Sequence, residues 1–162
     1  MLKFIREEKG IISAYFGVLL LVFLLFSALG LDYGNAFVLK HQLQSACDAA
    51  SLAGASAVSA KLITDGMGNV TGEKLVLDPV IAEARATDIW AQNVASLKFT
   101  AKGVTIVDTS NHLTLDSDGD GYLDTYRWGV TATVPSILAG PLTGMGNEIS
   151  VTRVADSKVR EP

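Results

Sequence analysis

The sequence predicts an α+β fold, in which a long N-terminal helix spans a membrane and leads into a small antiparallel, strand-rich domain with one short helix. Apolar residues make up 49% of the chain and are concentrated near the N-terminus, where they form a long run without charged residues. The next segment repeats alanine at helical spacing, whereas later segments are rich in Val, Ile, Thr and aromatic residues, which favour strands. With 162 residues, the chain allows one compact domain and an appendage.

Residues 11–31 form the predicted transmembrane helix. Tyr15 is the one ionisable side chain in this run. A helix of this length rises about 30 Å, which matches the hydrocarbon core of a bilayer. Small residues at positions 27–30 leave a cleaved secretory signal peptide as an alternative. The run is longer than the usual apolar region of a signal peptide, which favours a retained anchor.

The charges on either side of this run predict its orientation. Residues 1–10 form a basic tail with Lys3, Arg6 and Lys9, whereas Lys40 alone follows the run within about 20 residues. Because positively charged flanks stay in the cytoplasm, we expect a single-pass protein of the inner (cytoplasmic) membrane. Its N-terminus would be cytoplasmic and its C-terminal domain extracytoplasmic.

Residues 32–61 are expected to continue the helix outside the membrane as an Ala-rich rod. Small and apolar residues recur at spacings of three and four: Ala36, Leu39, Leu43, Ala46, Ala50, Ala53, Ala57 and Ala60. Small side chains let a neighbouring element approach closely. Two partners remain open for this alanine seam, namely strands of the same chain and helices of sister subunits.

Two stretches of this region resemble a known family. Residues 31–34 read Leu-Asp-Tyr-Gly, and residues 43–55 read Leu-Gln-Ser-Ala-Cys-Asp-Ala-Ala-Ser-Leu-Ala-Gly-Ala. With the basic tail and the apolar run, residues 6–60 resemble the N-terminal region of TadG-like proteins of the TadE/TadG family, which belong with Tad (Flp, tight adherence) pilus assembly. The resemblance implies a pilin-like helix held in the membrane and a variable exterior domain.

The same resemblance implies partners and a role. Other pilin-like or Tad assembly subunits would contact the N-terminal helix, membrane lipid would surround it, and the chain could form a homo-oligomer or join a surface filament. Pilin processing follows a Gly that has Glu five residues later, but Tyr15 stands five residues after Gly10. This departure argues against cleavage after Gly10 and favours an accessory subunit over a major pilin.

Residues 62–162 form the predicted extracytoplasmic domain. The turn residues at 64–69 mark its start, and Pro79 opens a short helix that extends to about Asn93. Four antiparallel strands are expected at residues 97–107, 112–115, 122–134 and 148–154. In the third of these, alternate residues predict one buried face, made of Tyr122, Tyr126, Trp128, Val130, Ala132 and Val134.

Residues 116–124 read Asp-Ser-Asp-Gly-Asp-Gly-Tyr-Leu-Asp and match the first nine positions of a calcium loop. Gly121 stands where such a loop turns sharply. The predicted calcium ligands are the carboxylates of Asp116, Asp118 and Asp120, the carbonyl oxygen of Tyr122, and Asp124 directly or through water. Arg127 replaces the bidentate Glu of the twelfth position, which predicts weakened Ca²⁺ affinity. The alternative is that Asp and Gly merely form the turn.

The remaining composition excludes several classes of function. The net charge is −4 and no Lys/Arg cluster follows residue 10, so the basic surface that nucleic acid requires is absent. The single cysteine, Cys47, cannot form an intramolecular disulfide and is expected to pack as a small apolar side chain. Motifs of phosphate-binding loops, zinc proteases and nucleophile elbows are missing, and His41 and His112 have no catalytic partner nearby in sequence. We expect no enzymatic activity.

Two functions remain. The first is a structural or assembly subunit of a Tad-type (Flp) pilus or related surface appendage, anchored by the N-terminal helix and carrying a calcium-stabilised hairpin. The second is a membrane-tethered, calcium-dependent binding module of the adhesin-like kind.

Overall fold

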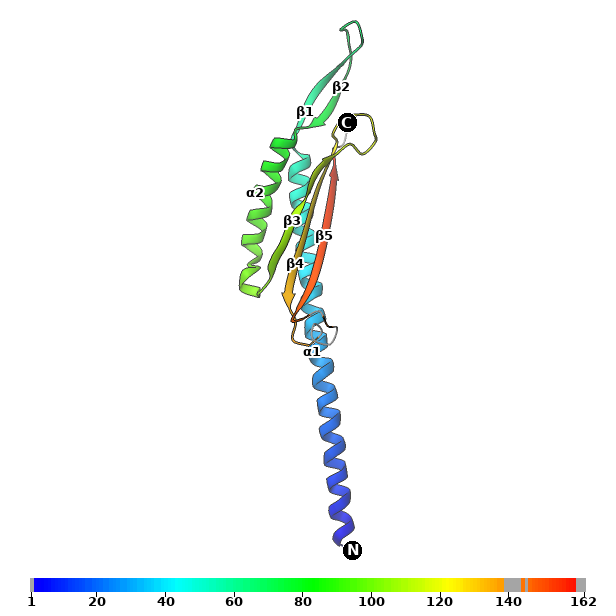
Figure 1. The fold of residues 1–162 in the computed structure, drawn as a ribbon, viewed down its shortest axis with the longest axis vertical. Coiled ribbons are helices and arrows are strands. Elements are labelled where there is room, and N and C mark those ends of the chain that lie inside the picture. The colour runs from blue at the N-terminus through cyan, green and yellow to red at the C-terminus, as the bar shows by residue number, and fades with distance from the viewer. Residues whose placement is uncertain (1, 139–143, 145, 160–162) are drawn as a thin grey trace. The chain divides into compact units, whose positions relative to one another are not determined.

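The computed structural model describes the backbone of residues 2–138, 144 and 146–159, and their side chains except at residues 2–10, 108 and 110. The lysines and arginine predicted to orient the N-terminal tail therefore lie outside the described side chains. The elements follow one another as α1 (Leu2–Ala55), β1 (Val58–Thr64), β2 (Val70–Leu77), α2 (Pro79–Leu97), the 3-10 helix η1 (Thr100–Lys102), β3 (Thr105–Leu115), β4 (Thr125–Pro135) and β5 (Glu148–Lys158) (Figure 1).

The strands form two sheets, which are the hairpin β1–β2 and a three-stranded sheet in the order β3-β4-β5. The α+β prediction is confirmed. The chain divides into two compact units. The first comprises Met1–Phe37 and Pro135–Ile149, and the second comprises Val38–Val134 and Ser150–Pro162.

In the first unit, α1 carries the apolar run. Every side chain from residue 11 to residue 27 is exposed, including Phe16 at 66% and Phe26 at 70%. The helix contains one segment, Ile11–Ala55, that is long and apolar enough to cross a membrane. A helix that is apolar on all sides needs either a protein core or lipid around it. Within the described residues, protein covers this run only partly and only near its end, at residues 28 and 29.

In the second unit, the later part of α1 packs against the three-stranded sheet. Leu43, Ala46 and Ala50 have no exposed surface. The hydroxyl of Ser51 lies 2.8 Å from that of Ser157 on β5, which places helix and strand in direct contact. Here the alanine seam is covered by strands of the same chain, the first of the two partners that the sequence left open.

The helix ends at Ala55, so the prediction that it extends to residue 61 is wrong. The carbonyl oxygen of Ser56 accepts a hydrogen bond of 2.8 Å from Nη1 of Arg85, and the Ser56 hydroxyl turns back to the carbonyl of Ala53. Val58 then pairs with Leu77 in the hairpin. Strand pairing with β2 thus outweighs the helical spacing of Ala57 and Ala60, the last two alanines of the seam. The domain boundary predicted at residue 62 falls inside β1.

The turn predicted at residues 64–69 is present as the tip of the β1–β2 hairpin. The backbone N–H of Asp65 donates to the carbonyl of Asn69 at 2.9 Å. The Asp65 carboxylate accepts hydrogen bonds from the backbone and side-chain amide of Asn69 and from the backbone of Met67, and these bonds lower its pKa. Gly68 adopts a φ of 86°, which suits glycine in this tight connection.

Helix α2 begins at Pro79, as predicted, because Asp78 caps it by accepting hydrogen bonds from the backbone N–H groups of Val80 and Ile81. It ends beyond the predicted limit, where Lys98 takes a left-handed φ of 51°. The strand predicted at residues 97–107 is therefore wrong in its first part, which completes α2 and forms η1. Its last part and the strand predicted at 112–115 belong to the single strand β3.

The buried face predicted for the long strand is confirmed in β4 for five alternate residues: Tyr126, Trp128, Val130, Ala132 and Val134. The ring of Trp128 lies 5.7 Å from that of Trp90 on α2 and 3.8 Å from the stacked ring of His112 on β3. Tyr126 contacts α1 near Gly54. Both helices of this unit therefore cover the same face of the sheet.

Candidate metal site

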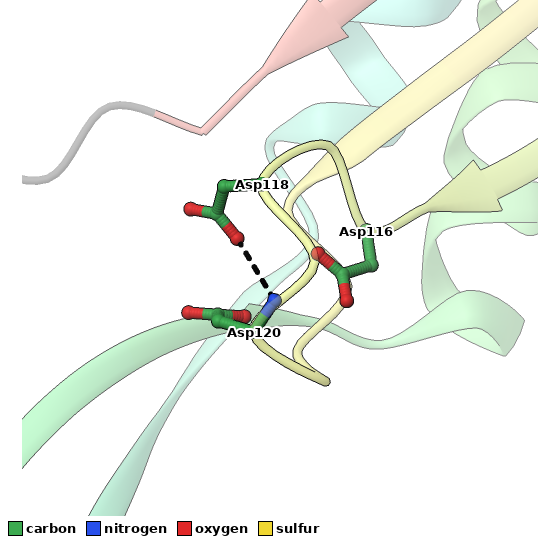
Figure 2. Close-up of side chains that lie close together, drawn as sticks. All are labelled: Asp116, Asp118 and Asp120. Atoms are coloured by element: carbon green, nitrogen blue, oxygen red, sulfur yellow. Dashed lines mark hydrogen bonds between the residues drawn. The ribbon is translucent and has the colours of Figure 1, made fainter.

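The acidic loop connects β3 to β4 and holds three of the predicted ligands close together. One carboxylate oxygen from each of Asp116, Asp118 and Asp120 lies within 4.8 Å of the others (Figure 2). The two oxygens of Asp116 accept hydrogen bonds of 2.7 Å from the backbone N–H groups of Gly119 and Gly121. The chain therefore wraps around Asp116.

Two glycines permit this wrapping. Gly119 and Gly121 adopt φ values of 78° and 87°, in the region that only glycine enters readily. The backbone N–H of Gly121, with that of Gly119, outweighs desolvation and lowers the pKa of Asp116. These hydrogen bonds favour the charged form of Asp116, which is the form in which a carboxylate binds Ca²⁺.

Lysines from distant parts of the sequence contact the other two carboxylates. Lys74 of β2 forms an ion pair with Asp120, and the ammonium of Lys158 lies 3.8 Å from Asp118. Within the loop, Asp118 accepts a weak bond from the backbone of Asp120 at 3.4 Å (Figure 2), and Asp120 accepts from the backbone of Tyr122 at 2.9 Å. The loop charge is thus partly balanced by protein cations.

Asp124 lies apart from the three converging carboxylates. It is 5% exposed and accepts hydrogen bonds from the backbone and hydroxyl of Ser117 and from the hydroxyl of Thr125. Lys158 completes the set at 2.9 Å. Burial raises the pKa of Asp124, but the bonds from Lys158, Ser117 and Thr125 outweigh it and hold the pKa far below its usual value.

Tyr122, predicted to offer its carbonyl oxygen, directs its ring toward the β1–β2 hairpin. The ammonium groups of Lys61 and Lys74 lie 5.1 Å and 5.3 Å from the centre of that ring. The backbone N–H of Leu77 also donates to the carbonyl of Leu123 at 2.8 Å. The acidic loop therefore joins the base of the hairpin to the end of the three-stranded sheet.

Arg127, at the twelfth position of the calcium pattern, points to the opposite face of the sheet. Its guanidinium makes two hydrogen bonds of 2.7 Å to the two carboxylate oxygens of Asp156 on β5. These bonds raise the pKa of Arg127 and lower that of Asp156. The side chain at position twelve is thus committed to a cross-strand ion pair.

A second polar cluster joins α2 to the sheet. Glu83 accepts a hydrogen bond of 2.6 Å from the hydroxyl of Tyr126 and lies 3.0 Å from Nδ1 of His112. Burial of Tyr126, with the hydrogen bond to Glu83, raises the pKa of this phenol. Sequence reading found no partner for His112 because Glu83 is 29 residues away on another element.

Lys74 and Lys158 are the neighbours of the acidic loop that sequence reading missed. The spacing of the Asp residues reveals the loop, but the two lysines precede and follow it by more than 30 residues and carry no motif. A lysine in a strand is ordinarily a solvated surface residue. The one available signal was the excess negative charge of the loop, which requires a cation of some kind nearby.

Comparisons with known proteins identify one region. Residues 10–57 match the family model described as putative Flp pilus-assembly TadE/G-like. No curated protein and no solved structure gave a significant match. The matched region coincides with most of α1, and a helix that can cross a membrane fits the membrane or surface location of pilus assembly. The resemblance predicted from the sequence is therefore confirmed: residues 10–57 are similar to the Flp pilus-assembly TadE/G-like family, which supports a pilus-related subunit.

Proposed function

We propose that this chain is a structural, non-enzymatic assembly subunit of a Tad-type (Flp) pilus or a related surface appendage. The observation that carries the proposal is the coincidence of the family region, residues 10–57, with one uninterrupted helix whose first part is apolar and exposed. A helix of this kind is stable in lipid, because all its backbone hydrogen bonds are internal. The N-terminus is cytoplasmic and the second unit extracytoplasmic.

The face of α1 left uncovered by the sheet is the part of the family region that can meet other subunits. The buried seam residues, such as Ala46 and Ala50, are fully covered within the chain and are therefore unsuitable as an assembly surface. Leu52, by contrast, is 67% exposed on the same helix. A contact with another pilin-like or Tad subunit would place such a side chain at the interface.

The test is complementation of a strain from which this protein has been deleted, with surface pili counted by electron microscopy. The unaltered protein should restore pili, and Leu52→Glu should lower their number while the protein remains in the membrane. Val80→Glu is the matched control, because Val80 is 79% exposed on α2, outside the family region. Normal piliation in the deletion strain would contradict the proposal, and so would equal effects of the two variants.

We further propose that the acidic loop binds Ca²⁺ through Asp116, Asp118 and Asp120. Carboxylate oxygens are the ligands Ca²⁺ prefers, and the spacing with glycine at the sixth position is that of a calcium loop. Bound Ca²⁺ would stiffen the junction between the hairpin and the sheet. Ca²⁺ can bind Asp120 only when Lys74 releases it, and this competition predicts weak affinity. Arg127 points to the same result, because it stands at the position of the bidentate Glu and is bonded to Asp156.

Calorimetry and thermal unfolding of the full chain in detergent test the calcium proposal. The full chain is needed because α1 forms part of the core of the second unit. Millimolar Ca²⁺ should release or absorb heat and raise the unfolding temperature, and Asp118→Asn should abolish both effects. The absence of both effects with the unaltered protein would remove Ca²⁺ and leave the loop as a turn. The adhesin-like alternative predicts instead that Asp118→Asn abolishes surface binding while pili remain normal.

A further inference from the structure

The segment that follows β4 is fastened to α1 at the end of the apolar run. Asp32 is only 1% exposed, although it follows an uncharged helical stretch. One carboxylate oxygen accepts a hydrogen bond of 2.8 Å from the backbone N–H of Ile137. The other accepts from the backbone N–H of Leu138 at 2.7 Å and from the hydroxyl of Ser136 at 2.9 Å. All four residues belong to the first unit.

This arrangement satisfies groups that are costly to bury. A carboxylate removed from water is stable only when several donors meet it, and Asp32 receives hydrogen bonds from Ser136, Ile137 and Leu138. The same bonds satisfy the irregular segment, because its successive backbone N–H groups at Ile137 and Leu138 donate to the Asp32 carboxylate of the helix. Irregular backbone can approach hydrocarbon only when its polar groups are satisfied by protein in this way.

The side chain of Leu138 extends along the apolar run. It lines an open apolar pocket together with four residues of α1: Val22, Leu25, Phe26 and Leu29. These positions precede Leu31, the last residue of the run, and at about 1.5 Å per residue they extend roughly 3 to 14 Å back along the helix. Leu138 therefore lies at the same level along the helix axis as the last part of the apolar run. The side chain of the neighbouring Ile137 is 67% exposed.

We propose that Ile137 and Leu138 form a second membrane contact, inserted among lipid acyl chains beside α1 and positioned by Asp32. The proposal rests on the membrane anchoring proposed above and goes beyond it, because a single apolar helix fixes its depth only approximately and does not fix its rotation. Lipid is the occupant that fits, since the pocket continues the exposed apolar surface of the helix. The polar groups beside the pocket already form hydrogen bonds with one another. They are the Asp32 carboxylate, the Ser136 hydroxyl and the backbone N–H groups of Ile137 and Leu138.

The consequence is a defined depth for the protein in the bilayer. Asp32 sits at the boundary, the apolar pair lies on the hydrocarbon side, and α1 cannot slide outward without drawing Ile137 and Leu138 into water. Exposing two large apolar side chains to water is unfavourable in proportion to their area. An anchor with this second contact resists both sliding and rotation, which suits a subunit that must present fixed surfaces to its neighbours.

Depth-dependent fluorescence quenching of the full chain in phosphatidylcholine vesicles tests the proposal. A Cys47→Ala background removes the native thiol, and single cysteines at Ile137, Phe23 and Met67 carry an environment-sensitive dye. Phe23 is 67% exposed in the apolar run and reports on the helix itself, whereas Met67 is 90% exposed at the hairpin tip and is the aqueous control. Spin labels on the lipid headgroup, upper acyl chain and lower acyl chain serve as quenchers.

The dye at Ile137 should emit at shorter wavelength than the dye at Met67 and should be quenched most by the upper acyl-chain label. Two results would overturn the second contact and leave the anchor intact. In both, the acyl-chain labels quench the dye at Phe23, but the dye at Ile137 is either not quenched or is quenched by the headgroup label alone. An apolar emission at Ile137 without lipid quenching would also overturn it and indicate a protein partner. Failure of quenching at Phe23 would refute the membrane anchor.

Asp32→Asn tests the positioning role. The substitution keeps the size of the side chain but removes one of the two acceptor oxygens and the charge. We expect acyl-chain quenching at Ile137 to fall while quenching at Phe23 stays constant. Unchanged quenching at Ile137 in this variant would show that Asp32 does not position the segment.

Discussion

A Cβ atom at Gly54 would lie 2.3 Å from Cδ1 of Tyr126, which is too close for two carbon atoms that are not bonded to each other. Tyr126 is 1% exposed and is held by its hydrogen bond to Glu83, so its ring cannot yield. Gly54→Ala should therefore destabilise the protein by about 1 to 3 kcal/mol, as overpacking of a core does. Thermal unfolding of the full chain in detergent measures this effect.

Gly34→Ala provides the control in the same helix. Among the described residues, nothing lies within 4 Å of a Cβ atom built at Gly34. Alanine at such a helical position should stabilise by up to about 1 kcal/mol relative to glycine. If both variants shifted the unfolding temperature in the same direction, close packing at Gly54 would not be the cause.

Cys47 is expected to resist modification in the folded protein. Its side chain is fully buried, and burial, with a smaller contribution from Asp48, raises the pKa of the thiol to about 12. Because the thiolate is the reactive form, a disulfide reagent at neutral pH should react slowly in buffer and rapidly in denaturant. Rapid reaction of the native protein would contradict the packing of α1 on the sheet.

The carboxylate of Asp124 should make the stability of the folded protein fall at acid pH. Its folded-state pKa lies below the unfolded value of about 3.9, so its stabilising effect is fully present above that value and is lost as the pH falls through the folded pKa. The unfolding temperatures of the unaltered protein and Asp124→Asn should differ most near neutral pH and converge below about pH 4. A constant difference across this range would exclude the ionised carboxylate as the cause.

At the level of the elements, the hairpin β1–β2 and the acidic loop are coupled through Lys74. Lys74→Met removes the charge but keeps an apolar stem, so Asp120 loses its competing cation. Calcium affinity, measured by calorimetry, should rise severalfold. Lys61→Met is the matched control, because Lys61 is the cross-strand neighbour of Lys74 and also lies over Tyr122. Equal effects of Lys74→Met and Lys61→Met on calcium affinity would mean that the loss of one positive charge near the loop, and not the contact with Asp120, controls the affinity.

Local patterns predicted the elements whose determinants are close together in sequence. The alternation from Tyr126 to Val134 predicted the buried face of β4, and Pro79 predicted the start of α2. The alanine repeat misled where it continued past Ala55, because the residues that end α1 are Arg85 and the strand partner β2. A turn at residues 64–69 between two segments that alternate apolar and polar residues in part was the unused signal for a hairpin.

The candidate site was predictable in part for the same reason. Asp116, Asp118 and Asp120 converge because two-residue spacing and glycine turns act locally. The distinct role of Asp124 depends on Lys158, and the burial of Asp32 depends on residues more than 100 positions later. Such contacts are created by the fold and leave no periodic or spacing pattern in the sequence.

For the protein taken together, one helix serves two environments. Its first part is apolar on every side and exposed, whereas its later part presents small residues to the sheet of the second unit. Residues 10–57, which match the pilus-assembly family, therefore include both the apolar run and the alanine seam on one element.

The anchoring of residues 11–31 in lipid is tested most directly by alkaline extraction of membranes that contain the full-length protein, followed by detergent extraction. We predict that the chain stays in the membrane pellet at high pH, which strips peripheral proteins, and that detergent alone releases it, because the exposed apolar helix is stable only in a hydrocarbon environment. Recovery of the intact, full-length chain as a monomer in detergent-free buffer would contradict the anchor and the function built on it.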